Sequence, residues 1–115
     1  MAIFRRELEP ILANVVEAAP FVFTAGAIAD NLSLDVEGQA KEAFRDLDKF
    51  LGMCGTSKSR ILWCTIWLSD IRLRDAMNKA WLGWIDPANL PARACVEGKM
   101  ADAECLFEIQ VIAAK

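Results

Sequence analysis

The segment Pro91-Ala92-Arg93-Ala94-Cys95-Val96-Glu97, together with the closing run from Glu104 to Ala113, decides the fold of this chain. In the first segment, residue types alternate along the chain. If the segment is extended, Arg93 and Cys95 lie on one face, and small or apolar residues lie on the other. The closing run is almost wholly apolar and carries one carboxylate, Glu108, near its middle. We expect both segments to be β-strands.

The connection between these strands, Gly98 to Ala103, is short enough for a hairpin-like return. Partners in an antiparallel pair keep a constant sum of residue numbers, so a turn centred near Met100 and Ala101 would bring Arg93 opposite Glu108 within a register step. An arginine that faces a glutamate on two adjacent, mostly apolar strands would be partly buried, and burying charged side chains costs free energy. The sequence therefore predicts a functional site around these two residues.

Length and composition limit the classes of protein to consider. With 115 residues, of which 55% are hydrophobic, we expect one domain over residues 1–115 that buries a further face in an oligomer. No apolar run approaches the roughly 18 residues of a membrane span, and no signal peptide opens the chain. The net charge is −3, with no cluster of Lys and Arg. These features predict a cytoplasmic protein with no membrane partner and no nucleic-acid partner.

The chain has no histidine and no tyrosine. The lack of histidine removes every Ser-His or Cys-His nucleophile. The four cysteines, Cys54, Cys64, Cys95 and Cys105, lack the spacing of a zinc site, so we expect reduced structural thiols, no metal and no cofactor. Any chemistry must therefore use Arg, Lys, Asp, Glu, Ser, Thr, Cys, backbone groups or water.

Hydrophobic periodicity predicts an α+β fold in the order β-β-β-α-β-α-β-β. Apolar residues at helical spacing predict one helix from Leu34 to Cys54, and a cap at Ser69 or Asp70 begins a second helix that ends near Trp84. The run Arg60–Leu68 is apolar on both faces, as in a strand buried from both sides. The other expected strands are Ile3–Arg6, Ile11–Val16, Phe21–Thr24, Pro91–Glu97 and Glu104–Ala113.

Two helices can cover only one face of a sheet of about six strands. Two of the expected strands are nevertheless apolar on both faces, so another subunit is the best candidate to cover the second face. Arg93 and Glu108 would then lie on or near a subunit boundary.

Several segments resemble the reactive-intermediate deaminase family (Rid, or YjgF-like). They are Phe23-Thr24-Ala25-Gly26, the helix over Ala40–Leu51, Thr65–Asp70 and, above all, Pro91–Glu97 followed by Phe107-Glu108-Ile109. The resemblance implies a chorismate-mutase-like α+β subunit, with a mixed sheet of about six strands, two helices on one face and a homotrimer with clefts between subunits. It also implies an enzyme that hydrolyses enamines and 2-imino acids, such as 2-aminoacrylate and its imine, to 2-keto acids and ammonia.

The same resemblance implies roles for individual residues. Arg93 matches the arginine that holds the substrate carboxylate, and Glu108 matches the glutamate that positions a water. Cys95 matches a position that lines the site, where its backbone N–H could matter more than its sulfur, and Gly26 matches the glycine beside the site. Ala25 stands where the family usually has serine, Ala27 replaces a polar residue, and the family's N-terminal tyrosine is absent, so a more apolar pocket is expected.

Three alternatives accompany this interpretation. Arg93 and Glu108 could form a structural ion pair across a subunit interface. A non-catalytic protein could use the same cleft to bind a small carboxylate or keto acid. An endoribonuclease role has been attached to some relatives, but this acidic chain has neither a basic groove nor a histidine.

Overall fold

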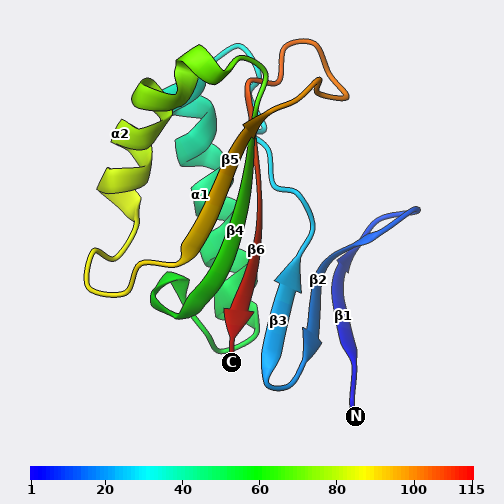
Figure 1. Cartoon of the computed structure of the whole chain (residues 1–115). Helices are drawn as coiled ribbons and strands as arrows, with labels where there is room; N and C mark the ends of the chain where they lie inside the picture. Colours follow the sequence, from blue (N-terminus) through cyan, green and yellow to red (C-terminus); the bar gives the residue numbers. More distant parts are fainter.

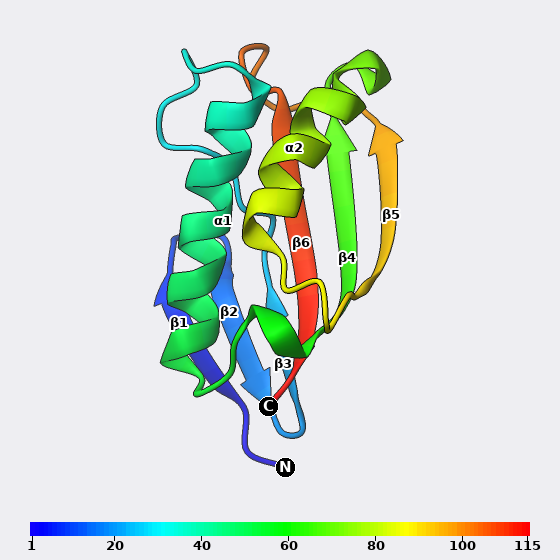
Figure 2. The same cartoon turned by 90° about the vertical axis from the view of Figure 1, so that its left-hand side faces the viewer.

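The computed structural model describes residues 1–115 as one mixed sheet with two helices packed on a single face (Figures 1 and 2). The strand order is β1-β2-β3-β6-β4-β5. All neighbouring strands are antiparallel except β4 and β5, which are parallel. The strands are β1 Phe4–Leu8, β2 Ala13–Ala18, β3 Phe21–Thr24, β4 Ile61–Leu68, β5 Ala92–Glu97 and β6 Phe107–Ala114, and the helices are α1 Val36–Met53 and α2 Arg74–Trp84.

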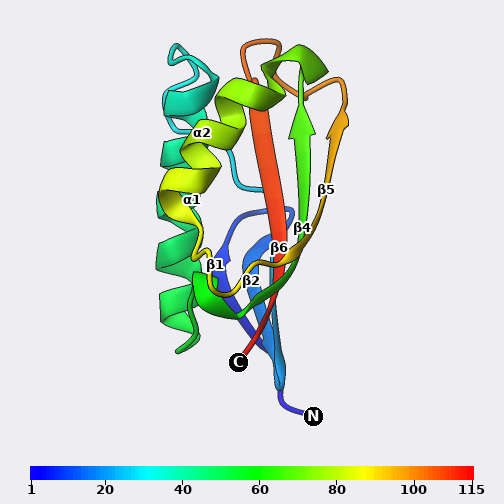
Figure 3. The ribbon, with the colours of Figure 1, turned by 60° about the vertical axis from the view of Figure 1, so that its left-hand side comes forward.

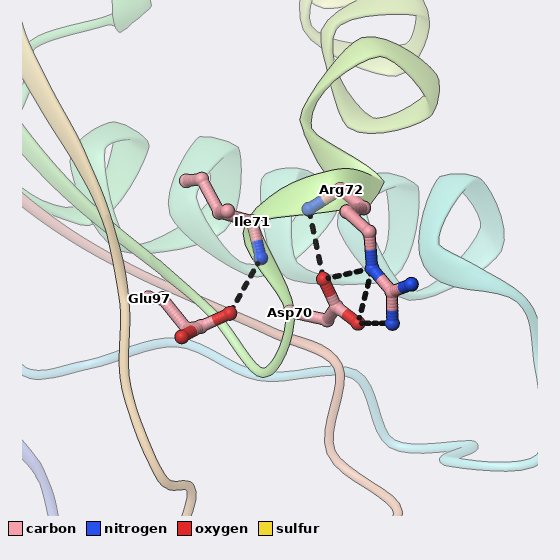
Figure 4. Close-up of polar contacts among 4 residues, drawn as sticks. All are labelled: Asp70, Ile71, Arg72 and Glu97. Carbon is pink, nitrogen blue, oxygen red and sulfur yellow. Dashed lines mark hydrogen bonds and ion pairs between the residues drawn. The ribbon is translucent and has the colours of Figure 1, made fainter.

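The expected α+β class, element order and helix placement are confirmed, with shifts of a few residues at the ends of elements. The second helix begins later than expected, because Asp70 first caps a short 3₁₀ turn over Ile71–Leu73. Its carboxylate accepts a hydrogen bond from the Arg72 N–H at 2.9 Å and pairs with the Arg72 guanidinium (Figure 4). Glu97 accepts a hydrogen bond from the Ile71 N–H at 3.0 Å and so ties the end of β5 to this turn.

Helix α1 forms because its sequence supplies both a cap and an apolar face. Asp35 accepts a hydrogen bond from the Gly38 N–H at 2.9 Å and so satisfies one of the free donors of the first turn. The apolar face of α1 packs on the sheet beside α2, and Phe44 makes edge-to-face contacts with Phe107 of β6 and Trp81 of α2. Such aromatic pairs add to the burial of apolar area, which is the main stabilising term. Neither helix is long and apolar enough to cross a bilayer.

No helix of this chain covers the face of the sheet that points away from α1 and α2 (Figure 3). Four of its large apolar side chains, Phe21, Phe23, Trp63 and Val96, are between 39% and 43% exposed. They come from three strands whose register places them on the same side of the sheet. We call this surface the open face. The surface is apolar, as the sequence predicts for the second face of the sheet; that a partner covers it stays a prediction.

The predicted hairpin between the last two strands is wrong. Strand β4 lies between β5 and β6, and Arg93 is in register with Cys64 whereas Glu108 is in register with Trp67. The constant-sum rule applies only to strands that are direct neighbours. Strand β4, which has apolar residues on both faces, lies between the other two, and the chain after β5 passes over the end of β4 to reach β6.

A buried carboxylate on β2 links both ends of the chain. Glu17 is 3% exposed and pairs with Arg6 of β1 at 3.1 Å and with Lys115 at 2.6 Å. These cations, above all the Lys115 ammonium, hold the pKa of the Glu17 carboxyl below its ordinary value, although burial opposes the shift. A carboxylate whose pKa is lower in the folded state stabilises the fold above its unfolded pKa, and this contribution is lost as the pH falls through the folded value.

We predict that Glu17→Gln lowers the melting temperature at pH 7, because Arg6 and Lys115 lose their shared anion. The deficit should shrink as the pH falls below about 4.3, the ordinary pKa of a glutamate, and should vanish once the pH has fallen through the lowered folded pKa, where the wild-type carboxyl is itself protonated. Calorimetric melting from pH 3 to pH 8 at fixed protein concentration measures this. Glu104→Gln, an exposed carboxylate with no side-chain partner, is the matched control. A deficit that stays constant across this pH range would contradict the prediction.

Candidate active site

Glu108 places a carboxylate on the open face of β6. Its neighbours Phe107 and Ile109 are fully buried on the helix face, so the alternation of the strand turns Glu108 the other way. Its register partner on β4 is Trp67, which lies on the same face. The side chain is half-buried, yet it makes neither an ion pair nor a hydrogen bond with another side chain. Glu108 is therefore available to a ligand.

Gly26 lies directly against the Glu108 carboxylate. The adjacent residue, Ala27, exchanges two backbone hydrogen bonds with Ile109, of 2.7 and 3.1 Å, which hold this loop beside β6. A Cβ built on Gly26 would lie 2.8 Å from Cδ of Glu108 and closer still to its Oε2. Only glycine fits here without displacing the carboxylate. The structure therefore brings together Gly26 and Glu108, two of the residues predicted from the sequence. Ala25, a third predicted residue, immediately precedes Gly26 in the chain.

A small cavity of about 170 Å³ opens beside Glu108. Sequence reasoning missed most of its lining, because loop conformation decides which side chains of the β5–β6 connection reach it. Trp67 could have been found, since it is the register partner of Glu108, but only after the strand order was known. The lining residues are Trp67, Gly98, Lys99, Met100, Ala101 and Glu108.

Arg93 lies on the other face of the sheet. Its register partner Cys64 is fully buried under the helices, and its guanidinium lies over the ring of Trp81 in α2, 4.8 Å from the ring centre. This cation–π contact is its only polar interaction, because no carboxylate pairs with it and no acceptor receives its N–H groups. A half-buried guanidinium with its donors unused suits a planar anion such as a carboxylate.

Cys95 lies on the same face of β5 as Arg93. Burial raises the pKa of its thiol, and the nearby cations Arg93 and Arg74 oppose this shift without reversing it. Burial raises the pKa of Cys64, on the neighbouring strand, to about 12. Both thiols are therefore protonated at neutral pH, and neither is an activated nucleophile. This agrees with the expectation that the sulfur of Cys95 is not the reactive group.

Arg93 and Glu108 thus lie on opposite faces of the sheet with β4 between their strands. One subunit cannot present both side chains to one small ligand. The predicted site residues form two separate groups instead, Glu108 with Gly26 on the open face and Arg93 with Cys95 on the edge strand β5. The arrangement also excludes an ion pair between Arg93 and Glu108 within a subunit.

Comparison with known proteins identifies the family. The family model described as "Endoribonuclease L-PSP" matches residues 9–115. A RutC family protein from Haemophilus ducreyi is 35% identical over 92 residues, which cover 80% of this chain and 79% of that protein. The RutC family protein YoaB from Escherichia coli is 32% identical over 114 residues, which cover 99% of each.

Solved structures share the fold over the whole chain. NMB1025 from Neisseria meningitidis, a member of the YjgF protein family, superposes with a TM-score of 0.96 at 30% identity, covering 100% of this chain and 96% of that chain. An uncharacterized protein from Pseudomonas aeruginosa superposes with a TM-score of 0.95 at 25% identity, covering 99% of each. The matched family model, the identity to these relatives and the common fold together show that the chain belongs to the YjgF-like reactive-intermediate deaminase (Rid) family.

Proposed function

We propose that this protein is an imine and enamine deaminase whose site is shared between two subunits. Glu108 and Gly26 come from one subunit, and Arg93 comes from its neighbour. The observation that carries the proposal is that Arg93 and Glu108 are both half-buried, unpaired charges on opposite faces of the sheet. Membership of the Rid family supports the same reaction class.

The reaction requires a clamp for the substrate and a water at the reacting carbon. Arg93 holds the carboxylate of a 2-imino acid through two parallel hydrogen bonds, a geometry that lysine does not offer. Glu108 accepts a proton from a water whose oxygen bonds to the imine carbon, while the C=N double bond becomes single. Glu108 then returns this proton to nitrogen, which gives a carbinolamine. The hydroxyl proton of the carbinolamine passes through Glu108 to nitrogen, the C–N bond breaks as the C=O bond forms, and ammonia and a 2-keto acid are released. An enamine enters the same sequence after tautomerising to the imine.

The main alternative is a protein that binds small carboxylates or keto acids without turnover. Arg93 alone would serve such a protein. An unpaired Glu108 beside the binding cavity would repel an anionic ligand and so weaken its binding. A free carboxylate next to a water-accessible cavity favours hydrolysis over simple binding. The family description as an endoribonuclease has less support here, because the chain has a net charge of −3 and lacks histidine.

We further propose that the assembly is a homotrimer. The open face, with Phe21, Phe23, Trp63 and Val96 partly exposed, provides an apolar surface for a second copy of the chain. In a ring of three subunits, the Arg93 of each subunit would meet the Glu108 of the next subunit, so that three complete sites form. The ligand is a small imino or keto acid, and the proposed chemistry uses no cofactor or metal.

The shared site predicts complementation between two inactive variants. Arg93→Ala and Glu108→Gln should each reduce hydrolysis of imino acids generated by an amino-acid oxidase by roughly 10²- to 10⁴-fold. Equal co-expression of the two variants gives mixed oligomers. In these, a site has both native residues where a Glu108→Gln subunit supplies Arg93 and an Arg93→Ala subunit supplies Glu108. Random assembly should restore about one quarter of wild-type activity. Mixed oligomers that stay inactive, although each variant folds and assembles, would contradict a site shared in this way.

Gly26→Ala should reduce turnover by roughly 10²-fold, because the new Cβ displaces the Glu108 carboxylate from its position. Steady-state kinetics should show the loss mainly in kcat. Gly52→Ala in α1 is the matched control, since a Cβ at Gly52 meets no atom within 4 Å. The control should keep full activity and gain about 1 kcal/mol of stability from its higher helix propensity. Equal activity of the two variants would remove Gly26 from the site.

Phe23→Asp should dissociate the oligomer, because it places a charge in the apolar open face. Sedimentation velocity at micromolar concentration should show a slower species, and deaminase activity should fall with it. Leu82→Asp on the outer surface of α2, where Leu82 is 74% exposed, is the control and should leave the assembly intact. An unchanged sedimentation coefficient for Phe23→Asp would show that the open face is not the interface.

A further inference from the structure

The cavity beside Glu108 has a volume of about 170 Å³, which is large enough for a small organic molecule. Its wall combines apolar surface with one charged side chain in addition to Glu108. The lining therefore indicates which kind of substrate side chain would be accepted.

Lys99 supplies the only cation on the wall of this cavity. It lies on the connection after β5, and its ammonium group makes no ion pair or hydrogen bond. The same lysine also borders an outer cavity of about 560 Å³ that includes Glu97 and Asp102. Those two carboxylates are engaged elsewhere, because Glu97 accepts from the Ile71 N–H (Figure 4) and Asp102 accepts from the Glu104 N–H. Lys99 therefore has no acidic partner in the subunit.

The backbone around Lys99 is held in place. The Gly98 N–H donates to the Leu68 carbonyl at 2.9 Å, which fixes the start of the connection at the end of β4. A Cβ on Gly98 would lie 3.5 Å from the Trp67 ring, so this segment packs directly on the wall of the cavity. Trp67 and Met100 supply apolar surface in the lining that also contains Lys99 and Glu108. Methylene groups would pack there, with a charged end directed to Lys99.

We infer that Lys99 makes this protein selective for 2-imino acids that carry a second carboxylate on a short side chain. The inference rests on the proposed function and names its substrate class. A second carboxylate that enters beside Glu108 meets a like charge, and in a half-buried cavity this repulsion needs a compensating cation. Lys99 is the one group on the cavity wall that supplies it. A neutral side chain would leave the ammonium without a partner.

The test compares dicarboxylic imines with neutral ones. Imines of aspartate and glutamate are generated in situ by an aspartate oxidase, and those of alanine and leucine by an amino-acid oxidase of broad specificity. Lys99→Met removes the charge and keeps a similar length, whereas Lys99→Arg keeps the charge. We expect Lys99→Met to lose about ten- to a hundredfold in kcat/KM for the dicarboxylic imines, the range of one hydrogen bond to a charged group. The loss in kcat/KM for the alanine imine should be clearly smaller, because its side chain carries no charge that could pair with Lys99, and Lys99→Arg should retain most of the preference.

Each other outcome overturns the inference or the proposed function, and the two failures are distinguishable. If wild-type protein hydrolyses neutral imines and Lys99→Met affects all substrates alike, the selectivity inference is wrong and the deaminase function stands. A leucine imine that outcompetes the dicarboxylic ones would assign selectivity to Trp67 and Met100 instead. If no imine is hydrolysed, the proposed function fails. Calorimetric binding of 2-oxoglutarate against pyruvate, with wild type and Lys99→Met, then tests the role of Lys99 independently.

Discussion

The position of β4 between β5 and β6 is the constraint on which the rest of the structure depends. β4 pairs with β5 on one side and with β6 on the other, because its side chains are apolar on both faces. This separates the two strands that carry the charged residues and turns Arg93 toward the helices and Glu108 away from them. The crossing of the chain over the end of β4 also creates the loop that forms the cavity beside Glu108.

The buried and half-buried charged side chains of this chain are of two kinds, those with ionic partners and those without. Glu17 is almost fully buried and is compensated by Arg6 and Lys115, so its role is structural. Arg93 and Glu108 are only half-buried, and neither has an ionic partner. Unpaired charges in partly buried positions cost stability and are common at functional sites. The contrast within one chain is the physical reason why we propose a catalytic role for the two unpaired groups and a structural role for the compensated cluster.

Much of the fold was predictable from the sequence, and the error lay in long-range pairing. Helical periodicity located α1 and the two-sided apolar pattern located β4, because both signals are local. The hairpin between Pro91–Glu97 and Glu104–Ala113 was wrong, because sequence proximity does not reveal that a third strand lies between two others. The closeness of Gly26 to Glu108 followed only from the family resemblance. Lys99 and Met100 carried no signal, since loop geometry alone brings them to the cavity.

The separation of Arg93 and Glu108 on two faces has a consequence for newly made protein. A single folded chain holds both halves of the proposed site and no complete one, so folding alone would not produce activity. Activity would follow the concentration of assembled protein by mass action and would fall more steeply than in proportion on dilution. The specific activity of this protein would therefore report its abundance as well as its chemistry, and a cell could silence it by limiting synthesis, without an inhibitor.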